Sequence, residues 1–126
     1  GSSEDLAEVH ILANLRLMKW SVSYFNQRVQ REITEWPVGI YADFLRLVFL
    51  MEGHGADLRL PHSRAMGDGL FELRCKGEEG IGRAFYCAMR GRQIVILHSF
   101  IKKTQETPDR ELKTARKRLK EIKHDK

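Results

Sequence analysis

The chain has few of the residues that mark several large protein classes. It contains two cysteines, Cys75 and Cys87, with neither a CxxC spacing nor a histidine cluster beside them. This pattern argues against a metal site and predicts reduced thiols in an intracellular protein. No apolar run approaches the roughly 18 residues that span a bilayer. The N-terminus also lacks the basic and apolar regions of a signal peptide. We therefore expect a cytoplasmic protein with no membrane partner.

Motifs for nucleotide binding and for covalent hydrolysis are also missing. The sequence has no P-loop, no GxGxxG after a predicted strand and no GxSxG elbow. Its five histidines lack metal-ligand spacing; they are His10, His54, His62, His98 and His124. We expect no metal and no cofactor.

What is present indicates one folded domain with an uneven charge distribution. The 126 residues are 42% hydrophobic and 31% charged, which is typical of a globular chain. Residues 102–126 hold ten Lys or Arg and five Asp or Glu, whereas residues 1–101 hold twelve of each. This basic C-terminal segment favours an anionic partner such as nucleic acid or an acidic protein groove. A solubilising helix face explains the same charges equally well.

The first half of the chain predicts a strand followed by a helical hairpin. Residues 19–24 alternate apolar and polar side chains, which is typical of a strand. Residues 25–36 and 38–52 repeat apolar side chains at helical spacing, and Pro37 separates the two helices. A loop is expected over residues 55–69, which carry turn residues at both ends.

The second half predicts a three-stranded antiparallel meander at residues 70–76, 81–89 and 93–101. The third strand has almost no polar interruption, so we expect it to be central and covered on both faces. A final helix is predicted with Thr107 as N-cap, Pro108 in its first turn and an apolar stripe that docks on the sheet. The order β-α-α-β-β-β-α gives an α+β fold.

Cations at strand ends are the main candidates for chemistry. Arg74 is expected on the sheet face opposite Leu73, and Arg83 begins the neighbouring antiparallel strand, so the two should lie close together. Lys102 and Lys103 follow the last strand and point to opposite faces, so only one of them can join this group. Two guanidiniums and an ammonium could hold a phosphodiester and stabilise its pentavalent transition state. RNA supplies its own nucleophile, the 2′-hydroxyl, so cleavage without a metal is chemically possible.

Simpler interpretations stand beside this one. Arginines and lysines at strand ends are commonly just solvated, and Arg74 could pair with a surface acid such as Glu72. His98 lies in an apolar strand, where a hydrogen-bonded core role competes with acid–base work. His62, in the predicted loop, is a weaker candidate of the same kind. Packing is the expected role of Tyr86, and the two cysteines are expected to be small apolar fillers.

Three separated strings carry a family resemblance: LPHS at 60–63, GDGLFELR at 67–74 and HSFIKKTQETP at 98–108. With these strings, the sequence resembles the phage-derived HigB-like branch of the RelE/ParE superfamily of toxins. The resemblance implies a RelE-like fold, in which the helical hairpin and the C-terminal helix pack on one curved, mainly antiparallel sheet. It covers about Lys19 to Ile122, so we expect a toxin domain at 18–126. Residues 1–17 would be an appendage compatible with a helix, and Gly1 and Ser2 resemble a cloning remnant.

The resemblance also implies a type II toxin that is an endoribonuclease, or mRNA interferase, acting on mRNA in the ribosome. The expected partners are mRNA, the ribosome and a cognate antitoxin of the helix-turn-helix HigA type. The toxin would contact operator DNA only through that antitoxin. Catalytic roles are implied for Arg74, Arg83, Lys103 as the favoured phosphate contact, and His98. RNA contacts are implied for Lys102, His62, Arg116 and Lys117.

Two departures from the family pattern leave the general acid or base open. Glu72 stands where RelE has a lysine, and the final helix lacks the tyrosine that RelE uses. Either His98 or His62 would have to substitute, or no such group exists. A non-enzymatic module, either a ParE-like gyrase inhibitor or an inactive regulator, is the alternative function. A general RNA-binding domain is a third.

Overall fold

The computed structural model describes residues 19–124, so the expected appendage at 1–17 lies outside the described residues. The elements, in chain order, are β1 (Ser21–Tyr24), α2 (Gln27–Thr34), α3 (Val38–His54), β2 (Ser63–Gly67), β3 (Leu70–Gly77), β4 (Gly80–Met89), β5 (Gln93–Ile101) and α4 (Asp109–His124).

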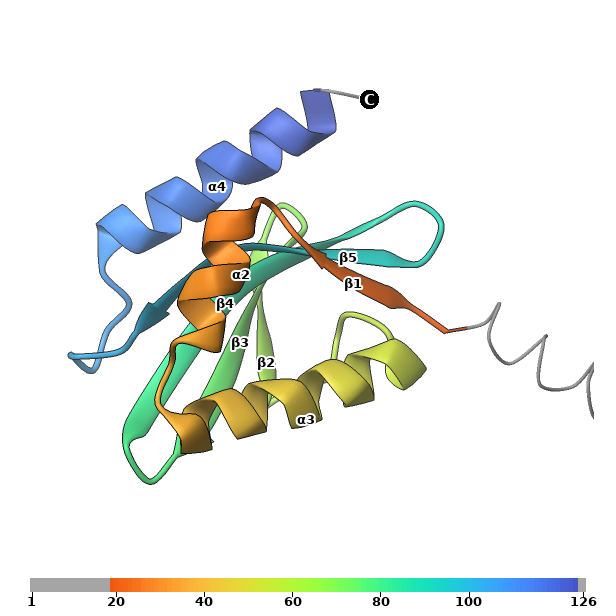
Figure 1. Ribbon diagram of the computed structural model, residues 1–126. Helices are drawn as coiled ribbons and strands as arrows, with labels where there is room; N and C mark the ends of the chain where they lie inside the picture. The colour runs from red at the N-terminus through yellow and green to blue at the C-terminus, as the bar shows by residue number, and fades with distance from the viewer. Residues whose placement is uncertain (1–18, 125–126) are drawn as a thin grey trace, which may run out of the picture.

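The five strands form one sheet in the order β1-β5-β4-β3-β2. β1 pairs with β5 in parallel, and the other neighbours are antiparallel. Helices α2 and α3 cover one face of the sheet and α4 covers the other (Figure 1). The predicted α+β fold is confirmed, and the architecture is consistent with a RelE-like fold.

The predicted loop at residues 55–69 is wrong in its second half, where β2 forms the edge strand beside β3. The sequence SRAMG has little alternation, because most of this strand is exposed and only Ser63 is buried. Its strand conformation depends on pairing with β3, which the local residues do not specify. The meander therefore has four strands rather than three.

The middle strand of the sheet is β4, because β1 adds to the far edge of β5. The prediction that residues 93–101 form the central strand is therefore wrong in position. The expectation that this strand is covered on both faces is confirmed: Ile94 and Ile96 pack in the core with α2 and α3, whereas Leu97 packs in the core with α4.

A bulge in β5 changes which side chains face α4 beyond Leu97. Phe85 pairs with His98 and Tyr86 pairs with Ile96, so Leu97 is the extra residue. Such a bulge shifts the alternation of the residues that follow it. His98 consequently lies on the same face as Leu97 and contacts Glu111 of α4. The residues at even positions after it, beginning with Phe100, continue on that face.

The core between α4 and the sheet follows the apolar stripe that the sequence predicts. Ala115 and Leu119 are buried there, with Leu112 and Ile122 packed at its border. The other core contains the apolar sides of α2 and α3. We refer to the side of the sheet that α4 covers as the α4 face.

The β3–β4 turn is fixed to the start of α3. The carboxylate of Glu79 accepts a hydrogen bond from the main-chain N–H of Gly39 at 3.0 Å. Hydrogen bonds from main-chain N–H groups lower the pKa of Glu79, because they stabilise its charged form. A β-carbon on Gly77 would lie 2.6 Å from the main chain of Gly39 and Ile40, so only glycine permits this approach. The strand end is thereby held beside the helix.

Candidate functional site

Arg74 on β3 and Arg83 on β4 are direct partners across the antiparallel pair. Leu70 and Phe85, on the same two strands, belong to the core beneath α4. Strand alternation therefore places both arginines on the α4 face. The prediction that these two side chains lie close together is confirmed.

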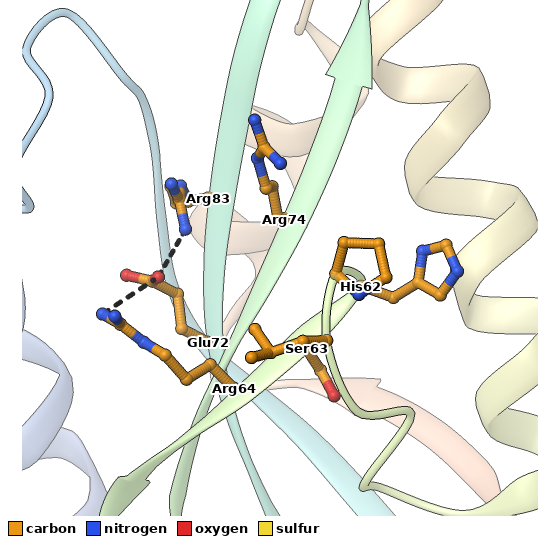
Figure 2. A pocket seen from close by; sticks show the side chains of 8 residues that line it. His62, Ser63, Arg64, Glu72, Arg74 and Arg83 are labelled. Atoms are coloured by element: carbon orange, nitrogen blue, oxygen red, sulfur yellow. Dashed lines mark hydrogen bonds and ion pairs between the residues drawn. The ribbon is translucent and has the colours of Figure 1, made fainter.

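A buried carboxylate organises this part of the sheet. Glu72 is 1% exposed, and its Oε1 accepts a hydrogen bond from Arg83 Nη1 at 2.5 Å. Arg64 on β2 approaches the same oxygen at 3.8 Å, and Thr107 donates its hydroxyl to Oε2 at 2.9 Å. Figure 2 shows Glu72 between Arg64 and Arg83, with Arg74 beside Arg83 on the neighbouring strand. Glu72 is thus neither a surface acid nor the partner of Arg74.

Arg74 differs from Arg83 in lacking an acidic partner among the described residues. Its Nε is buried without a hydrogen bond, and its main-chain N–H donates to the carbonyl oxygen of His62 at 2.8 Å. Of Arg64, Arg74 and Arg83, Arg74 is therefore the one whose charge no described carboxylate balances. This leaves its guanidinium available to an anionic ligand.

The segment between β5 and α4 is tied to the arginines through Thr107. The prediction that Thr107 caps the final helix is wrong, because its hydroxyl bonds Glu72 and α4 begins at Asp109. Thr107 instead spans 35 positions of sequence to reach the buried carboxylate. The loop that carries the two lysines is consequently held at the site.

The arginines border two adjoining hollows on the protein surface. The first, of about 390 Å³, is lined by Leu60, Pro61, His62, Ser63, Arg64, Glu72, Arg74 and Arg83. The second, of about 340 Å³, shares Arg64, Glu72 and Arg83 and extends to Thr107. Three guanidiniums against one carboxylate leave the first hollow positively charged. Such a hollow suits an anion such as a phosphate group.

The structure places Lys102, rather than Lys103, beside the arginines. Lys102 continues the β5 pairing by donating its main-chain N–H to Ile81 at 2.8 Å. It lies two residues after Phe100, on the α4 face. Partial burial lowers the pKa of Lys102, and the charges of Arg83 and Arg74 lower it further. Lys103 is exposed one position later, so Lys102 is the lysine of the pair that lies on the face of the two arginines.

The two candidate histidines lie in different surroundings. His98 contacts the Glu111 carboxylate through Nε2, stacks on Phe100 and does not line the first hollow. Phe85 separates it from Glu72 across the sheet. His62 lines the hollow, but Figure 2 shows its ring turned away from Glu72 and Arg83. Neither imidazole is in place to act on a group held by both arginines.

The expected RNA contacts on α4 also differ from each other. Arg116 donates to the main-chain oxygens of Met66 at 2.8 Å and Gly67 at 3.4 Å, and it lies 3.7 Å from the Asp68 carboxylate. It therefore holds the β2–β3 turn against α4. Lys117 is exposed and remains available to a partner.

The remaining candidates lie in the cores. Tyr86 stacks on Phe71 and donates its hydroxyl to Ala56 at 2.5 Å, and burial raises its pKa to about 12. Its expected packing role is confirmed. Cys75 and Cys87 are buried, as expected of apolar fillers, and burial raises the pKa of Cys75.

Two features are absent from residues 19–124. No group of three or more His, Cys, Asp or Glu residues there could hold a metal ion. No helix in the same range is long and apolar enough to cross a membrane.

Three site residues were missed by reasoning from the sequence: Arg64, Glu72 and Thr107. Strand alternation places Glu72 on the face of Arg74, so its position could have been found, although its buried partners could not. Arg64 was missed because its segment was predicted to be a loop, and Thr107 was missed because it was interpreted as a helix N-cap.

Comparison with known families gives a match over most of the chain. The family model described as phage-derived protein Gp49-like (DUF891) matches residues 31–120. This range includes the arginine pair, both lysines and both candidate histidines. A search of curated proteins found no match.

Proposed function

Because the chain belongs to the Gp49-like family of phage-derived proteins, which is associated with RelE-like toxins, we propose that it is the toxin of a type II toxin–antitoxin system, of the HigB-like branch. Its proposed activity is cleavage of mRNA on the ribosome in the cytoplasm. The observation that carries the proposal is the direct pairing of Arg74 with Arg83 on one face of the sheet, beside Lys102.

The proposed reaction is a phosphoryl transfer within the RNA chain. The 2′-oxygen attacks the adjacent phosphorus, a P–O2′ bond forms and the P–O5′ bond breaks. The 2′-hydroxyl loses a proton, the 5′-oxygen gains one, and the products carry a 2′,3′-cyclic phosphate and a 5′-hydroxyl. The transition state has additional negative charge on its non-bridging oxygens. This charge would be stabilised by Arg74, Arg83 and Lys102. Each preorganised contact of this kind raises the reaction rate roughly 10²- to 10³-fold.

Glu72 serves in this proposal as a positioning residue. Both of its oxygens already have protein partners, one in Arg83 and one in Thr107. Holding Nη1 of Arg83 fixes the direction of the guanidinium, and holding Thr107 keeps the lysine loop nearby. A donor fixed before the substrate arrives does not have to be ordered during the reaction.

Proton transfer is assigned to His62 rather than His98. His62 lines the first hollow, and because its ring is turned away from Arg83 in Figure 2, this role requires a different side-chain rotamer. His98 is already engaged by Glu111 beneath α4. We expect His62→Ala to lower cleavage about 10²-fold and His98→Ala to leave the cleavage rate of the folded protein unchanged.

The proposed protein partner is an antitoxin of the helix-turn-helix HigA type, through which operator DNA would be contacted. Exposed lysines on α4, namely Lys113, Lys117 and Lys120, would meet ribosomal RNA or an acidic segment of that antitoxin.

Expression in bacteria with mapping of mRNA ends by primer extension tests the proposal. The wild-type chain should arrest growth and cut mRNA. Arg74→Ala should abolish cutting without disturbing the fold, because Arg74 has no acidic partner within residues 19–124. Lys19→Ala, at the opposite edge of the sheet, is the matched control. Intact mRNA with normal growth in the wild type would overturn the proposal and favour a non-enzymatic module.

A further inference from the structure

A third hollow adjoins the first one and has no part in the proposed reaction. Its volume is about 320 Å³, and its lining residues are Asp43, Arg46, Pro61, His62, Arg74 and Lys76. Pro61, His62 and Arg74 line both hollows. Arg74 therefore belongs to two neighbouring spaces. A ligand long enough to occupy both would pass along its guanidinium.

The third hollow is positively charged in a way that local pairing does not cancel. Asp43 is the only acid among the described residues that line it; one of its oxygens lies 2.8 Å from Arg46, and the other accepts the main-chain N–H of Lys76 at 2.7 Å. The ammonium of Lys76 has no acidic partner among the described side chains, and the same holds for Arg74. Two uncompensated cations therefore border this space, with Arg46 held beside them by Asp43.

The spacing of these cations follows from the strand. Arg74 and Lys76 are two positions apart on β3, so they project from the same face about 6.6 Å apart. Arg74 is fixed at its backbone by the hydrogen bond to His62. The strand thus presents a row of positive charges that starts at the arginine pair and leads toward α3.

From this row we infer that the third hollow is a subsite for a second phosphate, the neighbour of the scissile one, in single-stranded RNA. The inference rests on the proposed function and adds a second phosphate subsite to it. The protein binds an oligonucleotide through at least two consecutive phosphates, one at Arg74 and Arg83 and the next at Lys76 and Arg46. If Lys76 were only solvated, it would not make the binding affinity depend on the length of the oligonucleotide.

Binding of short 2′-deoxy oligonucleotides tests this, because they lack the nucleophile and stay intact. A dinucleotide has one phosphodiester and a trinucleotide has two, and both affinities can be measured by NMR titration at low salt. We expect the wild type to bind the trinucleotide roughly tenfold more tightly, the value of one charge-assisted contact. The slope of log K against log salt should steepen by about 0.7 for the added phosphate.

Variants separate the subsite from general electrostatics. Lys76→Ala should remove the trinucleotide advantage and leave dinucleotide binding unchanged, and Arg46→Gln should reduce that advantage. Lys19→Ala removes the same charge from the other sheet edge and should preserve the advantage.

Equal affinity of the wild type for both ligands would overturn the inference. The inference would also be overturned if Lys76→Ala lowered the affinities for the dinucleotide and the trinucleotide equally. In either case dinucleotide binding that depends on Arg74, together with mRNA cleavage, would leave the proposed function standing. If the wild type binds neither ligand and mRNA stays intact, the proposed function fails with it.

Discussion

Replacing Glu72 by glutamine should make the protein less stable and at the same time a better anion binder. Glu72 is buried, and its carboxylate meets the Arg83 guanidinium at 2.5 Å. The Arg83 side chain is itself only 15% exposed. Glu72→Gln keeps the shape and one acceptor oxygen but removes the charge. Arg83 would then be a largely buried cation without a counter-charge.

The magnitude follows from the cost of breaking a buried ion pair by removing one partner, which is about 3–5 kcal/mol. Two features reduce it here: glutamine still accepts a hydrogen bond, and Arg83 borders a hollow that water can enter. We expect the free energy of unfolding to fall by about 2–3 kcal/mol. Thr107→Val removes only one hydrogen bond to the same carboxylate and should cost about 1 kcal/mol.

Urea unfolding of the wild type and both variants measures these differences, and an unchanged m-value would show that the folded and unfolded states remain comparable. Titration with inorganic phosphate supplies the second readout. Its affinity should rise in Glu72→Gln, because one negative charge has left the hollow. If the free energy of unfolding of Glu72→Gln lies within about 0.5 kcal/mol of the wild-type value and its phosphate affinity is unchanged, Glu72 does not balance the charge of Arg83.

Further outcomes are expected for variants of the lysine pair, of two glycines and of Glu79. Lys102→Ala should lower the cleavage rate roughly 10²-fold or more, whereas the adjacent Lys103→Ala should change it less than about threefold; equal effects would contradict the assignment of Lys102. Gly77→Ala should cost about 1–3 kcal/mol in urea unfolding, since its β-carbon would meet the main chain of α3. Gly53→Ala, where a β-carbon meets nothing within 4 Å, should be neutral or stabilising. The pKa of Glu79 is lower in the folded state than in the unfolded state. Its charged form therefore stabilises the fold above the unfolded-state pKa, and this stabilisation is lost as pH falls through the folded-state pKa. Glu79→Gln should consequently lose less stability than the wild type between pH 6 and pH 3.

Several elements could be predicted from the sequence because their signals are local. An almost unbroken apolar run predicts where β5 begins and ends at residues 93–101. Apolar spacing predicts helices α2 and α3, and Pro37 predicts the break between them. β2 could not be predicted, since it is mostly exposed and its conformation comes from pairing with β3. The place of β1 beside β5 likewise depends on a parallel pairing between strands far apart in sequence.

The site shows the same division between local and long-range signals. Alternation and a short turn were enough to bring Arg74 and Arg83 together. The choice between Lys102 and Lys103 was beyond sequence reasoning, because the bulge at Leu97 reverses the alternation before the strand ends. The roles of Glu72 and Thr107 depend on one contact across 35 positions of sequence. No pattern within either segment signals that contact.

The most direct test of the central claim is the fate of mRNA in purified ribosome complexes incubated with wild-type protein and with Arg74→Ala. We expect fragments ending in a 2′,3′-cyclic phosphate for the wild type. For Arg74→Ala we expect a cleavage rate at least roughly 10²-fold lower, with unchanged urea unfolding. Wild-type cleavage rates in the folded Arg74→Ala variant would contradict the claim that the arginine pair on the α4 face acts on the phosphodiester.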